Sequence, residues 1–291
     1  MSKTDRAIRL AEKRLKMAFA GEDFYEAQEV LISLTNRLRA QQQFARAKAA
    51  LEDGMDKLLQ NHKDNAVAQL VKVHIDVLSE SPDHDPLNAG DYYVQLNERF
   101  SDDVSLLSFL RHTIAATTPE GGSHGRCQLH FSAAQSFLRA DPPKVKEALE
   151  QLVLSGYEPG QAKGDVVTTT VDALLAAPVE EQALLACKHV IRVAAYTSRD
   201  LGQAVYDAYV ERAPAMGRPL EFARYVLLTL TRDAAPLLTD LRKAYADTID
   251  DDLDKVLNKV AKRYYGVSDT KMKLPGLLGA LFGGAGGATA R

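Results

Sequence analysis

Three groups of residues have side chains and spacings that suit chemistry, and the motif HGRCQLH is the first of them. It places His124, Cys127 and His130 at successive steps of three, and these residue types can bind zinc. On a helix, steps of three turn successive side chains by about 60°, so the set spreads over about 120° and does not converge. No fourth ligand is spaced nearby. We therefore expect no metal here, and a buried His130 on the apolar face.

The second group is a run of carboxylates in the stretch IDDDLDKVLNKVAKR, which resembles a cation site at first sight. Its aspartates are Asp250, Asp251, Asp252 and Asp254. Lysine and arginine follow toward the end of the same stretch. Acidic residues at a helix start and basic residues at its end both favour the helix dipole. The run therefore indicates the first turn of a helix and not a ligand site.

The third group is a basic stripe near the N-terminus. Ile8, Ala11, Leu15 and Ala18 are spaced 3, 4 and 3, which predicts one apolar helix face. The basic stripe, defined as Arg6, Arg9, Lys13 and Lys16, has the same spacing shifted by two residues, or about 200° around the helix. It is expected to face solvent. A cationic face suits an acidic partner, but an ordinary solvated face has the same pattern.

Bulk properties exclude several classes of function. A composition of 46% hydrophobic and 26% charged residues is typical of a soluble globular protein. The net charge of −3 gives no general basic field, so nucleic acid is not an expected partner. Two cysteines fit a reducing compartment, and neither a signal peptide nor a long apolar run is present. We expect a cytosolic protein without direct membrane insertion. Motifs for nucleophiles, phosphate loops and metalloproteases are absent, so we expect no enzyme and no cofactor.

The elements that carry these groups have helical periodicity nearly throughout, separated by short breaks rich in Gly, Pro and Asp. The expected helices are 3–19, 22–39, 42–60, 64–79, 88–99, 103–117, 125–139, 143–155, 160–176, 179–196, 200–212, 219–232, 235–246 and 250–265. The first two pairs repeat at roughly 40 residues. Alanines mark expected helix contacts: Ala27, Ala45, Ala47, Ala49 and Ala50. The pattern predicts an all-α, irregular right-handed α-solenoid of stacked antiparallel helix pairs, similar to tetratricopeptide arrays.

Several stretches, in order along the chain, resemble one known family. The first is GEDFYEAQEVLISLTNRL followed by QFARAKAALEDGMDKLL, which is similar to the opening of the Get-four family, the scaffold of the guided-entry-of-tail-anchored-proteins (GET) pathway. PLEFARYVLLTLTRDAAPLLTDLRKAYADTIDDDLDKVLNKVAKRYYGV is similar to its C-terminal helices, and LPGLLGALFGG to its Leu/Gly-rich ending. Leu129–His130 also fits the opening of a middle helix.

The resemblance implies a two-sided adaptor without chemistry of its own. The N-terminal helical half, 1–120, would dock the ATPase targeting factor of the pathway. The C-terminal half, 121–270, would hold the N-terminal segment of a protein with a ubiquitin-like domain, and 271–291 would be a Gly-rich flexible tail. Another α-solenoid scaffold of a large complex is the main alternative, and an all-helical enzyme or phosphopeptide binder is a third. Co-purifying proteins would separate the three.

The resemblance also implies which residues dock each partner. The family's basic positions fall near Arg9, Lys13 and Arg14, and the expected ATPase-docking set adds Arg6, Lys16 and Asp64, the last being an acidic regulatory position. A further acidic position of the family is replaced around Val71 and Lys72. Relatives insert a β-hairpin where only APAMGRP separates Arg212 from Leu220. The expected partner groove comprises Leu227, Leu228, Leu237, Leu238, Tyr245, Tyr264 and Tyr265.

Overall fold

Helices make up the described part of the chain, residues 3–83, 86–120, 124–156, 163–213 and 217–267, and no strand occurs in it. The computed structural model contains α1 (Lys3–Ala20), α2 (Phe24–Ala40), α3 (Phe44–Gln60), α4 (Asp64–Glu80), η1 (Pro86–Ala89), α5 (Gly90–Asn97), α6 (Asp103–Ala116), α7 (Cys127–Arg139), α8 (Val145–Leu154), α9 (Lys163–Leu175), α10 (Val179–Tyr196), α11 (Arg199–Arg212), α12 (Arg218–Thr231), α13 (Ala235–Ala244) and α14 (Asp251–Tyr265). Every expected helix is present, with ends shifted by at most three residues. The all-α prediction is confirmed.

The chain divides into two compact units, Met1–Val166 (unit 1) and Val167–Arg291 (unit 2). This boundary falls inside α9 and does not coincide with the expected division at residue 120. The assignment of one partner to each half concerns function and stays a prediction. The expected Gly-rich tail lies outside the described residues.

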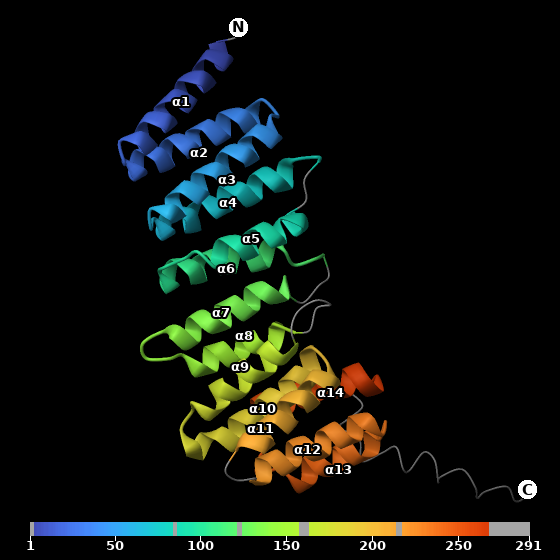
Figure 1. Ribbon diagram of the computed structural model, residues 1–291. Coiled ribbons are helices and arrows are strands. Elements are labelled where there is room, and N and C mark those ends of the chain that lie inside the picture. The colour runs from blue at the N-terminus through green and yellow to red at the C-terminus, as the bar shows by residue number, and fades with distance from the viewer. Residues whose placement is uncertain (1–2, 84–85, 121–123, 157–162, 214–216, 268–291) are drawn as a thin grey trace, which may run out of the picture. The chain divides into compact units, whose positions relative to one another are not determined.

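Unit 1 is a stack of antiparallel helices in which each of α1 to α4 packs against the next, α6 follows α4, and α7 and α8 close the series (Figure 1). The three turns that connect α1 to α2, α2 to α3 and α3 to α4 share one conformation. Their residues Glu22, Gln42 and His62 have positive φ angles of 56°, 58° and 55°. In each turn the next residue donates its N–H over 2.9 Å to a carbonyl five positions earlier. This is the Schellman type of helix end. Because these turns recur every twenty residues, each of α2, α3 and α4 begins at the equivalent position after its turn.

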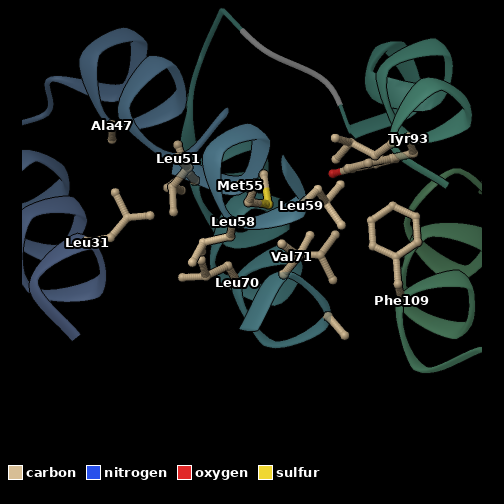
Figure 2. Close-up of a cluster of buried hydrophobic side chains, with 14 of the residues drawn as sticks. Leu31, Ala47, Leu51, Met55, Leu58, Leu59, Leu70, Val71, Tyr93 and Phe109 are labelled. Atoms are coloured by element: carbon tan, nitrogen blue, oxygen red, sulfur yellow. The ribbon is translucent and has the colours of Figure 1, made fainter. Parts of the chain in front are cut away.

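The core of unit 1 is a continuous band of Leu, Val and Ala between successive helices, and Figure 2 shows its middle part. Leu31 of α2 and Leu51 of α3 are both fully buried there. Gly54 permits the close approach of these helices, because a Cβ at that position would lie 2.3 Å from Leu31 Cδ2. The expected small contacts are confirmed for Ala27 and Ala47, which are fully buried. The expected helix contacts are wrong for Ala45 and Ala49 of α3, because both residues are exposed to solvent.

Unit 2 is organised around α10, which contacts α11, α12 and α14. The last turn of α14 supplies hydrogen-bond donors to the C-terminal end of α10. Arg263 donates to the carbonyls of Ala195 at 3.1 Å and Thr197 at 2.6 Å, and the Tyr264 hydroxyl donates to Ala194 at 3.0 Å. The last carbonyls of a helix lack partners within the helix. The two side chains therefore complete the α10 terminus and fix α14 against it.

Candidate protein-binding surfaces

The basic stripe belongs to α1, which is the first helix of the stack (Figure 1). Ile8, Ala11, Leu15 and Ala18 are buried, whereas all four side chains of the basic stripe are exposed. The two faces therefore have the opposition that their spacing predicts. What binds the cationic face stays a prediction.

Arg14 lies apart from the basic stripe and is engaged within unit 1. Its Nη2 atom is 2.5 Å from Glu26 Oε1 on α2, although the side chain remains more than half exposed. On the other flank of α1, Glu12 pairs with Arg46 of α3 at 2.8 Å. These pairs hold α1 on its neighbours. Among the residues of the expected docking set on α1, Arg14 is thus engaged by a carboxylate of unit 1.

Two exposed apolar side chains, Leu10 and Met17, lie beside the basic stripe and were not expected from the sequence. Leu10 is 61% exposed and Met17 is 63% exposed. Leu10 also lines a hollow of about 340 Å³ between α1 and α2. The lining residues are Ala7, Leu10, Ala11, Arg14, Glu26, Glu29, Val30, Ser33 and Arg37. The signal in the sequence that could have found them is their spacing of seven residues on the face opposite Ile8 and Leu15.

Asp64, expected to dock the ATPase, is only 4% exposed. Its Oδ2 atom accepts hydrogen bonds from the backbone N–H groups of Ser101 and Asp102, both at 2.6 Å, and from the Ser101 hydroxyl at 2.9 Å. The carboxylate thus ties the start of α4 to the segment that leads into α6. Nearby, Val71 is buried and Lys72 is exposed. The contacts of Asp64 are those of a brace within unit 1.

The residues of the expected partner groove differ in burial, and their role in binding stays a prediction. Leu227 and Leu238 are buried in the packing of unit 2, which leaves them no surface for a partner. Tyr264 is held at the α10 terminus by its hydrogen bond. Leu228 and Tyr265 are half-buried. Only Leu237 is an exposed leucine of this set, at 49%.

An aromatic cluster on α12 and α13 carries the exposed part of this region. Tyr245 packs against Phe222 at 5.1 Å and Tyr225 at 6.4 Å between ring centroids, and the Arg218 guanidinium lies 4.7 Å from the Tyr245 ring. Tyr225, which sequence reasoning missed, is 43% exposed. The α12–α13 patch is defined by residue type and exposure as the apolar residues of this region that are exposed or half-buried: Tyr225, Leu228, Leu237 and Tyr245.

The other two groups singled out for chemistry have structural roles. His130 is buried, its Nδ1 lies 2.8 Å from Gln151 Oε1, and burial lowers its pKa, which favours the neutral ring. Among the described residues, no cluster of histidine, cysteine and carboxylates is able to hold a metal. Asp250 caps α14 by accepting a hydrogen bond from the Leu253 N–H at 2.9 Å. The expected buried histidine and the expected helix start are confirmed.

A carboxylate–imidazole–hydroxyl chain inside unit 1 has the residue types of a catalytic relay. His74 Nδ1 lies 3.0 Å from the Tyr93 hydroxyl, and His74 Nε2 lies 3.4 Å from Glu52 Oε1. His74 and Tyr93 are fully buried, and burial raises the pKa of Tyr93. A substrate has no access to a hydroxyl without exposed surface. The chain of groups therefore joins α3, α4 and α5 inside unit 1.

Comparison with known proteins gives a consistent set of similarities. The model of the family described as Golgi to ER traffic protein 4 matches residues 41–283. A Golgi to ER traffic protein 4 homolog of Dictyostelium discoideum is 24% identical over 281 residues, covering 94% of this chain and 88% of that protein. Protein GET4 of Arabidopsis thaliana is 43% identical over 65 residues, which are 22% of this chain and 20% of that protein.

The fold has a counterpart among solved structures. The crystal structure of Get4 from C. therm. aligns with a TM-score of 0.69 and 17% identity, covering 100% of this chain and 99% of that chain. At this identity the likeness concerns the fold, and it agrees with the expected α-solenoid. No helix in the described ranges has the length and apolar character needed to cross a membrane.

Proposed function

The chain belongs to the Golgi to ER traffic protein 4 family, the scaffold family of the GET pathway for tail-anchored proteins, and from this premise we propose its partners. We propose that it is a cytosolic adaptor that joins the ATPase targeting factor of the pathway to a co-chaperone with a ubiquitin-like domain. Unit 1 would dock the ATPase through α1, and unit 2 would hold the N-terminal segment of the co-chaperone. The adaptor itself would catalyse no step.

The observation that carries this proposal is the exposed basic stripe on a helix whose opposite face is fully packed. Four cations on one exposed face attract an acidic surface, and such complementarity acts mainly on the association rate. Salt screens exposed charges over about 8–10 Å, so the interaction is expected to weaken as ionic strength rises. The family match begins at residue 41, after α2. The basic stripe on α1 therefore supports the proposal independently of that match.

The ATPase assignment is tested by reversing two charges of the basic stripe. We expect Arg9→Glu with Lys13→Glu to reduce ATPase affinity by more than roughly tenfold, measured by titration calorimetry with the purified ATPase. Both side chains are exposed, so the thermal midpoint should hardly change. Arg111→Glu with Lys144→Glu, also exposed in unit 1 and equal in charge change, is the control. Unchanged affinity in the first variant, or equal loss in the control, contradicts the assignment.

The co-chaperone assignment is tested on the α12–α13 patch. Leu237→Asp places a charge on this patch without touching the buried leucines of unit 2. We expect it to release the ubiquitin-like partner in a pull-down with purified proteins, while ATPase binding is retained. Val179→Asp, at an exposed position on α10, is the matched control and should retain both partners. Retention of the co-chaperone by Leu237→Asp would remove the patch from the proposal.

A further inference from the structure

We propose that Leu10 and Met17 are apolar anchors of the α1 surface and that their partner is an acidic amphipathic helix. This inference rests on the proposed function and specifies what the ATPase must present to α1. Along the outer face, Arg6, Leu10, Lys13 and Met17 follow one another at steps of 4, 3 and 4. These steps keep the four side chains on one line of the helix. Cations and apolar groups therefore alternate along a single exposed stripe.

The two apolar side chains are not needed for the fold of α1. The helix packs through Ile8, Ala11, Leu15 and Ala18, which are all buried. Leu10 and Met17 instead expose more than 60% of their surface, and they are two of only eight large apolar side chains that are exposed among the described residues. Removing apolar surface from water is favourable roughly in proportion to the area that is removed. Their removal from water on binding would supply an attraction that salt does not screen.

The hollow beside Leu10 provides a receptor for an apolar side chain of the partner. Ala7, Ala11 and Ser33 contribute small side chains to it, and Val30 contributes an apolar wall. Its volume of about 340 Å³ exceeds the space that one large side chain requires. Four charged residues, Arg14, Glu26, Glu29 and Arg37, also line it, and Arg14 and Glu26 form an ion pair. A leucine or phenylalanine of the partner can therefore enter between α1 and α2 and contact Leu10.

The spacing of the anchors selects a helical partner. Leu10 and Met17 are seven residues apart, which is two helical turns or about 10 Å along the axis. Apolar residues at i and i+7 of a second helix have the same separation, as in helix-in-groove recognition. Carboxylates on either side of those residues would meet Arg9 and Lys13. The surface therefore fits a helix with an apolar centre and acidic flanks.

A membrane surface fits the same face less well. Helices that lie in a lipid interface bury one broad apolar face. The broad apolar face of α1 is already packed on α2, and the outer face offers only two large apolar side chains separated by cations. Such a face gives little apolar area to a bilayer, but it matches a partner whose apolar residues are equally spaced.

The experiment separates apolar anchoring from charge. The full-length chain carrying Leu10→Ala with Met17→Ala is titrated with the purified ATPase at low and at high salt. We expect an affinity loss of roughly tenfold or more at both salt concentrations, with the salt dependence unchanged. Arg9→Glu with Lys13→Glu should instead flatten the salt dependence. Val104→Ala, which truncates an exposed side chain on α6, is the control and should bind like the wild type.

Each result decides between the readings of this surface. An unchanged affinity of the Leu10/Met17 variant, while the wild-type chain binds, overturns the anchors and leaves the proposed function intact. Absence of wild-type binding to the ATPase overturns both. Binding of the wild-type chain to phosphatidylserine vesicles that is lost in the Leu10/Met17 variant would assign the anchors to a lipid surface and also overturn the inference.

Discussion

Replacing Asp64 by alanine is expected to destabilise unit 1 strongly. Its Oδ2 atom accepts hydrogen bonds from two backbone N–H groups and one hydroxyl, those of Ser101 and Asp102, over 2.6–2.9 Å. Hydrogen bonds to a charged group contribute about 1.5–3 kcal/mol each. Ser101 and Asp102 themselves lie at the surface, so water replaces part of what is lost. After this discount, we expect the free energy of unfolding to fall by about 2–4 kcal/mol.

Urea denaturation followed by far-UV circular dichroism measures this loss, because the chain has no tryptophan to report by fluorescence. Hydrogen exchange should locate the effect, with faster exchange of the Ser101 and Asp102 amides. Asp64→Asn keeps one acceptor oxygen without the charge and should lie between wild type and alanine. Asp53→Ala removes an exposed carboxylate paired with Lys57 on α3, so it should change stability by less than about 0.5 kcal/mol.

One result would refute the bracing role. If Asp64→Ala changes the unfolding free energy by less than about 0.5 kcal/mol and leaves amide exchange unaltered, the hydrogen bonds do not brace α6. A simultaneous loss of ATPase binding would then return Asp64 to the docking set expected from the sequence.

Two further predictions concern unit 2 and the turns of unit 1. Burial lowers the pKa of His189 to about 3, whereas the unfolded ring titrates near 6.5, so stability should fall as pH drops between these values, by up to about 1.4 kcal/mol per unit; His189→Leu should flatten this dependence in thermal melts across pH. His62→Gly should raise the unfolding free energy by about 0.5–1 kcal/mol, because glycine adopts the positive φ without strain; calorimetry would contradict this by showing a lower midpoint.

The helices could be predicted from the sequence because their ends are local. Turn residues, caps and periodic apolar positions act over a few neighbours, and α14 illustrates this with Asp250 at its start and Gly266 in the left-handed conformation at its end. The burial of Ile8 and Leu15 in α1 could likewise be predicted, because it follows from their helical spacing. Local chemistry therefore determined most of the architecture.

The candidate surfaces were harder to predict because they depend on which helices meet. Asp64 is buried by a segment 37 residues later in the chain, a contact that no periodicity indicates. Leu227 and Leu238 have the same residue type as the exposed Leu237, and only tertiary packing separates them. Leu10 and Met17 stand out only once α1 is known to have its outer face uncovered.

The repeated turns of unit 1 make its length adjustable. The helices α2, α3 and α4 each have 17 residues and are joined by turns of one kind, so residues 24–63 form a module that ends in the register in which it began. Neighbouring packed helices lie about 8–10 Å apart, so a tandem copy of this module would carry α1 roughly 16–20 Å farther from α6. The module does not include α1. A natural or engineered duplication of residues 24–63 can therefore change the distance between α1 and α6 while it leaves the exposed face of α1 unchanged.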